Sequence, residues 1–163
     1  MRSTPKFARL LLAAAVTAAA TLVASCGDNL TLPFDGTPGA IVRFVFDGHP
    51  ADTMDVAITD AATIATARRF VLNGSGARLV TGRIVKGTGY DPHYPFHFIP
   101  DSVRLTEAAT EVCDGAPMHT AADVSAFFQG ATGDANAASA QWCPWSSRPI
   151  GVSGDLLIGN PKH

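Results

Sequence analysis

The chain has 163 residues, 47% of them hydrophobic and 16% charged, a composition typical of a protein with a buried core. It carries 12 lysine and arginine residues against 14 aspartate and glutamate residues. Three basic residues lie among the first nine positions, so the rest of the chain holds nine basic and 14 acidic residues, a net charge of about −5. This balance argues against binding to nucleic acid and against polybasic attachment to a membrane surface.

Residues 1–25 have the pattern of a secretory signal peptide. A basic start is followed by an apolar run over residues 10–23, in which the only polar residues are two threonines. The run is too short for a transmembrane helix, which needs about 20 residues. We therefore expect this segment to direct export and to be removed.

The predicted signal ends in Val23-Ala24-Ser25-Cys26, which resembles the lipobox of bacterial lipoproteins. In those proteins cleavage falls before the cysteine, whose sulfur and amino group then carry acyl chains such as palmitate. More than one chain is the condition for stable anchoring, so we expect a membrane anchor at Cys26 in the bacterial cell envelope. Gly27 lacks the aspartate that retains some lipoproteins at the inner membrane, which favours the outer membrane. The alternative is an ordinary signal with an unmodified cysteine.

Residues 26–40 contain several turn formers and no periodicity, which predicts a tether. The predicted domain covers 41–152, enough for a single domain, and residues 153–163 are a tail. Residues 41–46 and 53–59 are β-rich and predict a hairpin with a loop of about six residues. A helix should then run from an N-cap at Asp60 through Leu72, stopped by Asn73-Gly74.

The second half of the predicted domain continues this mixture of strands and helices. We expect strands at 77–87 and at 97–108, the latter bent at Pro100-Asp101, and a strand-like segment at 142–152. Thr120 begins a capping-box pattern for a short helix, and residues 130–141 form a low-complexity loop. Two helices and a mostly antiparallel sheet predict a small α+β domain.

Cys113 and Cys143 are the two cysteines outside the predicted lipidation site. In an oxidising compartment such a pair forms a disulfide more often than a metal site or a nucleophile. A bond closing a loop of about 30 residues would stabilise the domain by about 3.5 kcal/mol.

Two long motifs, IVKGTGYDPHYPFHFIPDSVRLTEAATEVCDG at 84–115 and WCPWSSRP at 142–149, resemble a known family. It is the N-terminal domain family of a slime-mould seventy-four-kilodalton calmodulin-binding protein, and the similarity covers nearly all of residues 41–150. One departure lies before Phe96, where the family has a pattern closer to N-P-P-W-S, so that His97 matches and His93 does not. Calmodulin binding belongs to one eukaryotic member and is not carried over, because neither predicted helix is a basic amphipathic target.

His93 and His97 suggest a metal site, with Glu111 or Asp114 as further ligands and His119 as another candidate. Prolines at 92 and 95 exclude a shared helix, and in an extended chain the two α-carbons would lie about 13 Å apart, too far for one zinc ion. We favour a turn leading into a strand that buries Phe96 and Phe98. A metal-dependent hydrolase using these two histidines and two carboxylates is the alternative. No cofactor is expected.

The segment at 143–149 allows two further interpretations. A disulfide-tethered loop presenting Arg148 could act as a protease inhibitor, although Pro149 fits poorly after a scissile bond. Alternatively, Trp142, Trp145 and Arg148 could anchor an interface, or the tryptophans could pack on the sheet with Arg148 paired to an acid. The favoured function is non-catalytic binding of a protein or small ligand at the cell envelope.

Overall fold

The computed structural model describes residues 37–153 and 156–158. In this part of the chain, β1 (Thr37–Phe46) pairs antiparallel with β2 (His49–Ile58), with Ala40 opposite Ile58 and Val45 opposite Thr53. The hairpin is confirmed, but its turn is Asp47-Gly48 and the predicted six-residue loop is wrong. Gly48 has a φ of 85°, which glycine adopts without strain, so the strands can reverse direction tightly.

The other edge of β1 is completed by the C-terminal part of the chain. β7 (Ser147–Val152) pairs with residues 42–46 of β1, and β8 (Leu156–Ile158) pairs with residues 37–39. The last residues of the predicted tether therefore belong to β1, and part of the predicted tail forms a strand. Their partners are distant in sequence, so no local pattern could show this. The signal peptide and Cys26 lie outside the described residues.

A second sheet is built around β3 (Leu79–Lys86), which pairs with β4 (Phe96–Phe98), β5 (Arg104–Thr106) and β6 (Ala140–Trp142), all antiparallel. The predicted strand at 97–108 is divided into β4 and β5 by a 3₁₀ turn, η1 (Pro100–Ser102), where the bend was expected. Proline at the first position of that turn suits it, because proline fixes φ and has no N–H to donate.

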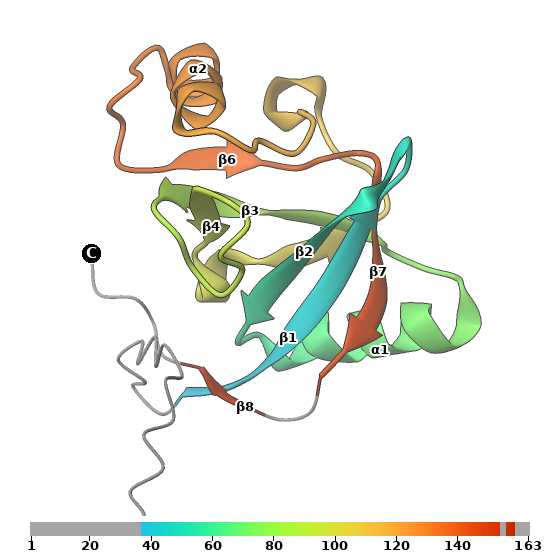
Figure 1. The fold of residues 1–163 in the computed structure, drawn as a ribbon. Helices are drawn as coiled ribbons and strands as arrows, with labels where there is room; N and C mark the ends of the chain where they lie inside the picture. The colour runs from blue at the N-terminus through green and yellow to red at the C-terminus, as the bar shows by residue number, and fades with distance from the viewer. Residues whose placement is uncertain (1–36, 154–155, 159–163) are drawn as a thin grey trace, which may run out of the picture. The chain divides into compact units, whose positions relative to one another are not determined.

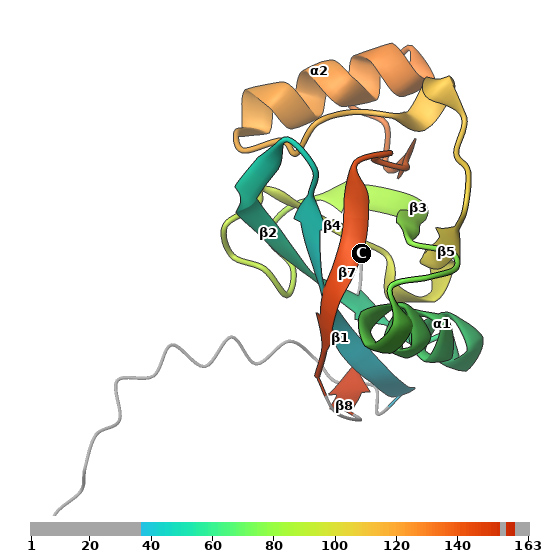
Figure 2. The same ribbon diagram turned by 90° about the vertical axis from the view of Figure 1, so that its right-hand side faces the viewer.

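Two helices lie at opposite ends of the molecule in both views (Figures 1 and 2). α1 (Ala61–Asn73) begins at the Asp60 cap, whose carboxylate accepts the Thr63 N–H at 2.8 Å. α2 (Ala121–Thr132) begins with the predicted capping box of Thr120 and Asp123. It includes the first residues of the predicted loop, because the cap that ends it is Gly133 in the left-handed conformation.

One hydrophobic core lies between the two sheets and under the helices, with Trp142 at its centre. The Trp142 side chain is 0% exposed, and its ring lies 5.1 Å from that of Phe96 and 5.4 Å from that of Phe98. The sheets are also joined by a polar contact, since the buried Ser147 hydroxyl accepts the N–H of Val80 at 3.0 Å. The predicted burial of both phenylalanines is confirmed.

The fold class is the predicted one: a small single α+β domain with antiparallel sheets, two helices and a Cys113–Cys143 disulfide, with 5.2 Å between the two α-carbons. The bond ties η2 (Glu111–Cys113) to the segment that follows β6. Among the described residues, no helix has both the length and the apolar character to cross a membrane.

Candidate functional site: a groove around Tyr94

The loop at 87–95, which contains most of the motif-rich stretch, is fastened to the outer edge of β2. The Asp91 carboxylate accepts the backbone N–H of Asp55 at 3.0 Å, and the Tyr94 hydroxyl donates to the Thr53 carbonyl oxygen at 3.2 Å. Asp91 is only 8% exposed. The loop therefore covers backbone groups that an edge strand would otherwise leave open.

His93 turns outward from this loop while its polar groups bind Asp91. Both its backbone N–H and its ring Nδ1–H donate to Asp91 Oδ1, at 3.0 Å and 2.8 Å. The His93 side chain is 85% exposed. This local turn holds the imidazole at the rim of a hollow.

His97 has a different, internal role. Its Nδ1 lies 2.8 Å from the carbonyl oxygen of Gly87, which can only accept, so the ring donates and closes the loop from the strand side. The ring packs so tightly on Gly89 that a β-carbon at that position would clash with it. His93 and His97 thus have separate partners, as expected for a turn leading into a strand.

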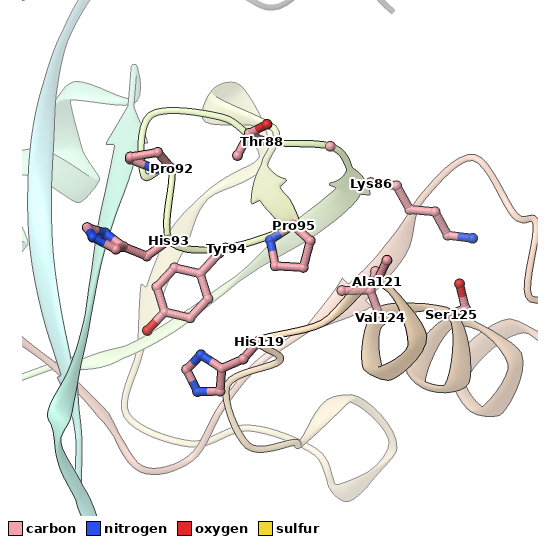
Figure 3. Close-up of a pocket in the computed structure, with 11 residues that line it drawn as sticks. Lys86, Thr88, Pro92, His93, Tyr94, Pro95, His119, Ala121, Val124 and Ser125 are labelled. Atoms are coloured by element: carbon pink, nitrogen blue, oxygen red, sulfur yellow. The ribbon is translucent and has the colours of Figure 1, made fainter.

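A groove of about 450 Å³ lies between this loop and the start of α2. Figure 3 shows Tyr94 and Pro95 of the loop facing His119, Ala121 and Val124. We call it the Tyr94 groove, and it is lined by Lys86, Gly87, Thr88, Pro92, His93, Tyr94, Pro95, His119, Ala121, Val124 and Ser125. Its inner surface is mostly apolar and its rim carries an amine, two hydroxyls and two imidazoles, the usual composition of a ligand site.

A second hollow of about 390 Å³ shares His93, Tyr94 and His119 with the groove and extends it to β2. There Asp52 lies between two imidazoles: its Oδ2 is 3.4 Å from His119 Nε2 and 3.7 Å from His49 Nδ1. The His119 ring also stacks obliquely on Tyr94, with 5.4 Å between centroids. Three histidines from three segments distant in sequence therefore meet at this end of the groove.

The Tyr94 hydroxyl is held in its protonated form. Burial, and then the negative charges of Asp52 and Asp91, raise the pKa of Tyr94 to about 12. Because the hydroxyl also donates to Thr53, it is a fixed structural donor at neutral pH and no base.

Lys86 connects the opposite end of the groove to α2. Its amine donates to the carbonyl oxygen of Ala135 and lies 5.2 Å above the centre of the Phe128 ring. Such a cation–π contact orders the long side chain. The amine thus fixes one wall of the groove.

The predicted metal ligands are not assembled. Among residues 37–153 and 156–158, no group of three or more His, Cys, Asp or Glu side chains could hold a metal ion. Glu111 is exposed, and Asp114 Oδ1 accepts the N–H of Trp145 at 2.9 Å beside the disulfide. The set of His93, His97, Glu111 and Asp114 is therefore wrong as a single site, because its members belong to separate local structures.

The segment at 143–149 is mostly structural. Trp142 lies in the core, so its prediction as an interface anchor is wrong, whereas Trp145 is 39% exposed. Arg148 donates to Asp47 at 3.1 Å, and residues 147–149 pair with β1. An inhibitor loop must be free to enter a protease cleft, so this pairing gives the inhibitor alternative no support.

Sequence reasoning named His93 and His119 but missed Asp52, Tyr94 and Lys86 as parts of the groove. Asp52 stood in what was predicted to be a loop, and Lys86 in an ordinary strand. A signal existed only for the local turn, because Asp91-Pro92-His93 has the spacing by which an aspartate binds the N–H two residues later.

These features define a class of protein before any comparison: a small disulfide-bonded α+β domain with an open groove beside a capped strand edge. The family model that describes the N-terminal domain of the seventy-four-kilodalton binding protein matches residues 40–153. The chain belongs to this family, and the predicted resemblance is confirmed. No curated protein and no solved structure matches the chain significantly.

Proposed function

We propose that this chain is a non-catalytic binding domain of the bacterial cell envelope, anchored by a lipid on Cys26. Its ligand is a protein segment or a small molecule that occupies the Tyr94 groove. The observation that carries the proposal is the groove itself, whose volume of about 450 Å³ falls in the range of ligand sites.

The polar groups around the groove favour binding over chemistry. Tyr94 is held protonated by burial, His97 is bound to Gly87, and Asp91 accepts three hydrogen bonds. A catalytic base needs a lone pair directed at substrate, and these three side chains are directed at backbone or at each other. The exposed groups, such as His93 and Ser125, suit recognition of a ligand's polar edge.

The position of the groove suits display from a membrane. The described chain starts at β1, at the end of the molecule where α1 lies, and the groove lies beside α2 at the other end (Figures 1 and 2). A lipid on Cys26 would attach at the α1 end. The groove would then open toward the surrounding compartment.

The anchor is tested by growing cells that express the full chain with an alkyne-tagged fatty acid. We expect label on the wild-type chain and none on Cys26→Ala, with the labelled chain in the membrane fraction. A wild-type chain that is exported but unlabelled would overturn the anchoring part of the proposal.

The groove is tested on the chain from Cys26 onward by mapping NMR shift changes caused by four probes: phenol, indole, cyclohexanecarboxylate and N-acetylglucosamine. We expect at least one probe to shift residues 86–95 and 119–125 together. Ser125→Trp should abolish this by filling the groove. Ala126→Trp, which adds the same ring to an exposed neighbour outside the groove, should not. Shifts that are absent, scattered or unaffected by Ser125→Trp would contradict the proposal.

A further inference from the structure

The outer surface of α1 combines positive charge with exposed apolar side chains. The helix buries Thr63, Ile64 and Ala67, which leaves Arg68, Arg69 and Leu72 on the solvent side at helical spacing. Leu72 is 81% exposed, and Val71 beside it is also exposed. The helix sequence AATIATARRFVLN contains two arginines and no acidic residue.

This composition departs from the rest of the chain, whose charge is negative overall. Arginines toward the C-terminal end of a helix interact favourably with its dipole, which accounts for the charge. The dipole does not account for a leucine left in water beside them. Basic side chains next to exposed apolar ones form the kind of helix surface that rests on anionic lipid.

The place of α1 in the fold supports the same partner. The described chain begins at Thr37, and the 11 residues from Cys26 can span at most about 40 Å when fully extended. α1 packs against β1 and lies at the same end of the molecule as the start of that strand (Figures 1 and 2). A lipid on Cys26 therefore keeps α1 within reach of the bilayer.

We propose that the α1 outer surface, formed by Arg68, Arg69, Val71 and Leu72, rests on the anionic head groups of the membrane that carries the anchor. The contact orients the domain so that the Tyr94 groove faces away from the bilayer. This inference depends on the lipid anchor of the proposed function, so its test supplies the anchor chemically.

The experiment uses the chain from Cys26 onward, which contains every described residue. Since Cys113 and Cys143 form a disulfide, Cys26 is the thiol that can be coupled to a maleimide lipid in nanodiscs. The nanodiscs contain phosphatidylcholine alone or mixed with phosphatidylglycerol, and a gadolinium-chelating lipid broadens NMR signals near the bilayer. With phosphatidylglycerol present, we expect amides of α1 to broaden strongly and those of α2 to stay sharp.

Three variants separate contact with lipid from damage to the helix. Arg68→Gln with Arg69→Gln should weaken the contact about fivefold for each charge removed. Leu72→Ser should weaken it without changing charge. Arg83→Gln removes an exposed arginine from the other sheet and should leave the broadening unchanged.

Equal broadening of α1 and α2 on both kinds of nanodisc would overturn the orientation, as would an equal effect of Arg83→Gln. Broadening of α1 that depends on protein concentration would assign the surface to a second copy of the chain and would also overturn it. Because the anchor is supplied chemically, failure here is distinct from failure of fatty-acid labelling at Cys26.

Discussion

The disulfide region, formed by residues 110–115 and 142–148, and the Tyr94 groove make opposite uses of conspicuous residues. In the disulfide region the most recognisable motif residues, Trp142, Cys113 and Cys143, are buried. The groove is built from residues that stand out less, such as Lys86, Ser125 and His119, each on a different element.

The difference shows that a dense motif can record what a small domain needs in order to fold. The tryptophan and the disulfide together hold the last strands against the core, which a domain of this size requires. Recognition depends instead on where elements end and which side chains they leave at the rim. Four measurements would sharpen or break this division, from the largest expected effect to the smallest.

Replacing the two tryptophans should give very different results. Trp142→Ala removes a fully buried ring and should lower the free energy of unfolding by about 3–5 kcal/mol. Trp145→Ala removes a partly exposed ring and should cost less than about 1 kcal/mol. Urea unfolding followed by circular dichroism measures both, and similar losses would show that Trp145 also serves the core.

Removing the disulfide should have the next largest effect. Cys113→Ser combined with Cys143→Ser opens a loop with a sequence separation of 30 residues and should cost about 3.5 kcal/mol. The same urea titration measures the loss. A loss comparable to that of a surface substitution would separate the disulfide from the structural role assigned to it.

The fastening of the 87–95 loop can be tested at Asp91. Asp91→Asn retains the shape but weakens bonds from the Asp55 and His93 N–H groups, and should cost about 2 kcal/mol. Hydrogen exchange at Asp55 should accelerate because its acceptor is poorer. Asp101→Asn, at an exposed aspartate on η1, is the matched control, and an equal cost there would refute the special role of Asp91.

The smallest effect concerns Asp47 at the hairpin turn. The hydrogen bond from Arg148, helped by Arg78, lowers the pKa of Asp47. A carboxyl whose pKa is lower in the folded state adds stability above its unfolded pKa near 4, and this stability is lost as pH falls through the folded value. Because Asp47 is half exposed, we expect well under 1 kcal/mol, roughly the value of a surface pair.

Unfolding curves of wild type and Asp47→Asn between pH 5 and about 2 measure this contribution. The difference in stability between the two proteins should shrink as the pH falls. A difference independent of pH would mean that Arg148 stabilises the domain through packing alone.

The sequence predicted the fold well wherever the information was local. The caps at Asp60 and Thr120, the glycine after α1 and the bend at Pro100 are each set by residues within a few positions. The partners of β1 were not predictable in the same way. Pairing of Thr37–Gly39 with β8 depends on residues more than a hundred positions away, and their backbones carry no local mark of it.

The candidate site was only partly predictable for the same reason. His93 and His119 were considered because histidine is chemically conspicuous, but 26 positions separate them and their meeting depends on tertiary packing. Trp142 was misjudged in the opposite direction, since a motif tryptophan suits an interface as well as a core. Only its 0% exposure decides between the two.

The place of β1 between β2 and β7 has a consequence for the order of folding. The first strand of the domain acquires its second neighbour only when residues 147–152 are available, and Ser147 then supplies the acceptor for the Val80 N–H. The core cannot close on a chain that is still missing its last strands. A nascent chain of this design stays open for nearly the whole of its synthesis, the condition in which a polypeptide can be threaded through a membrane pore.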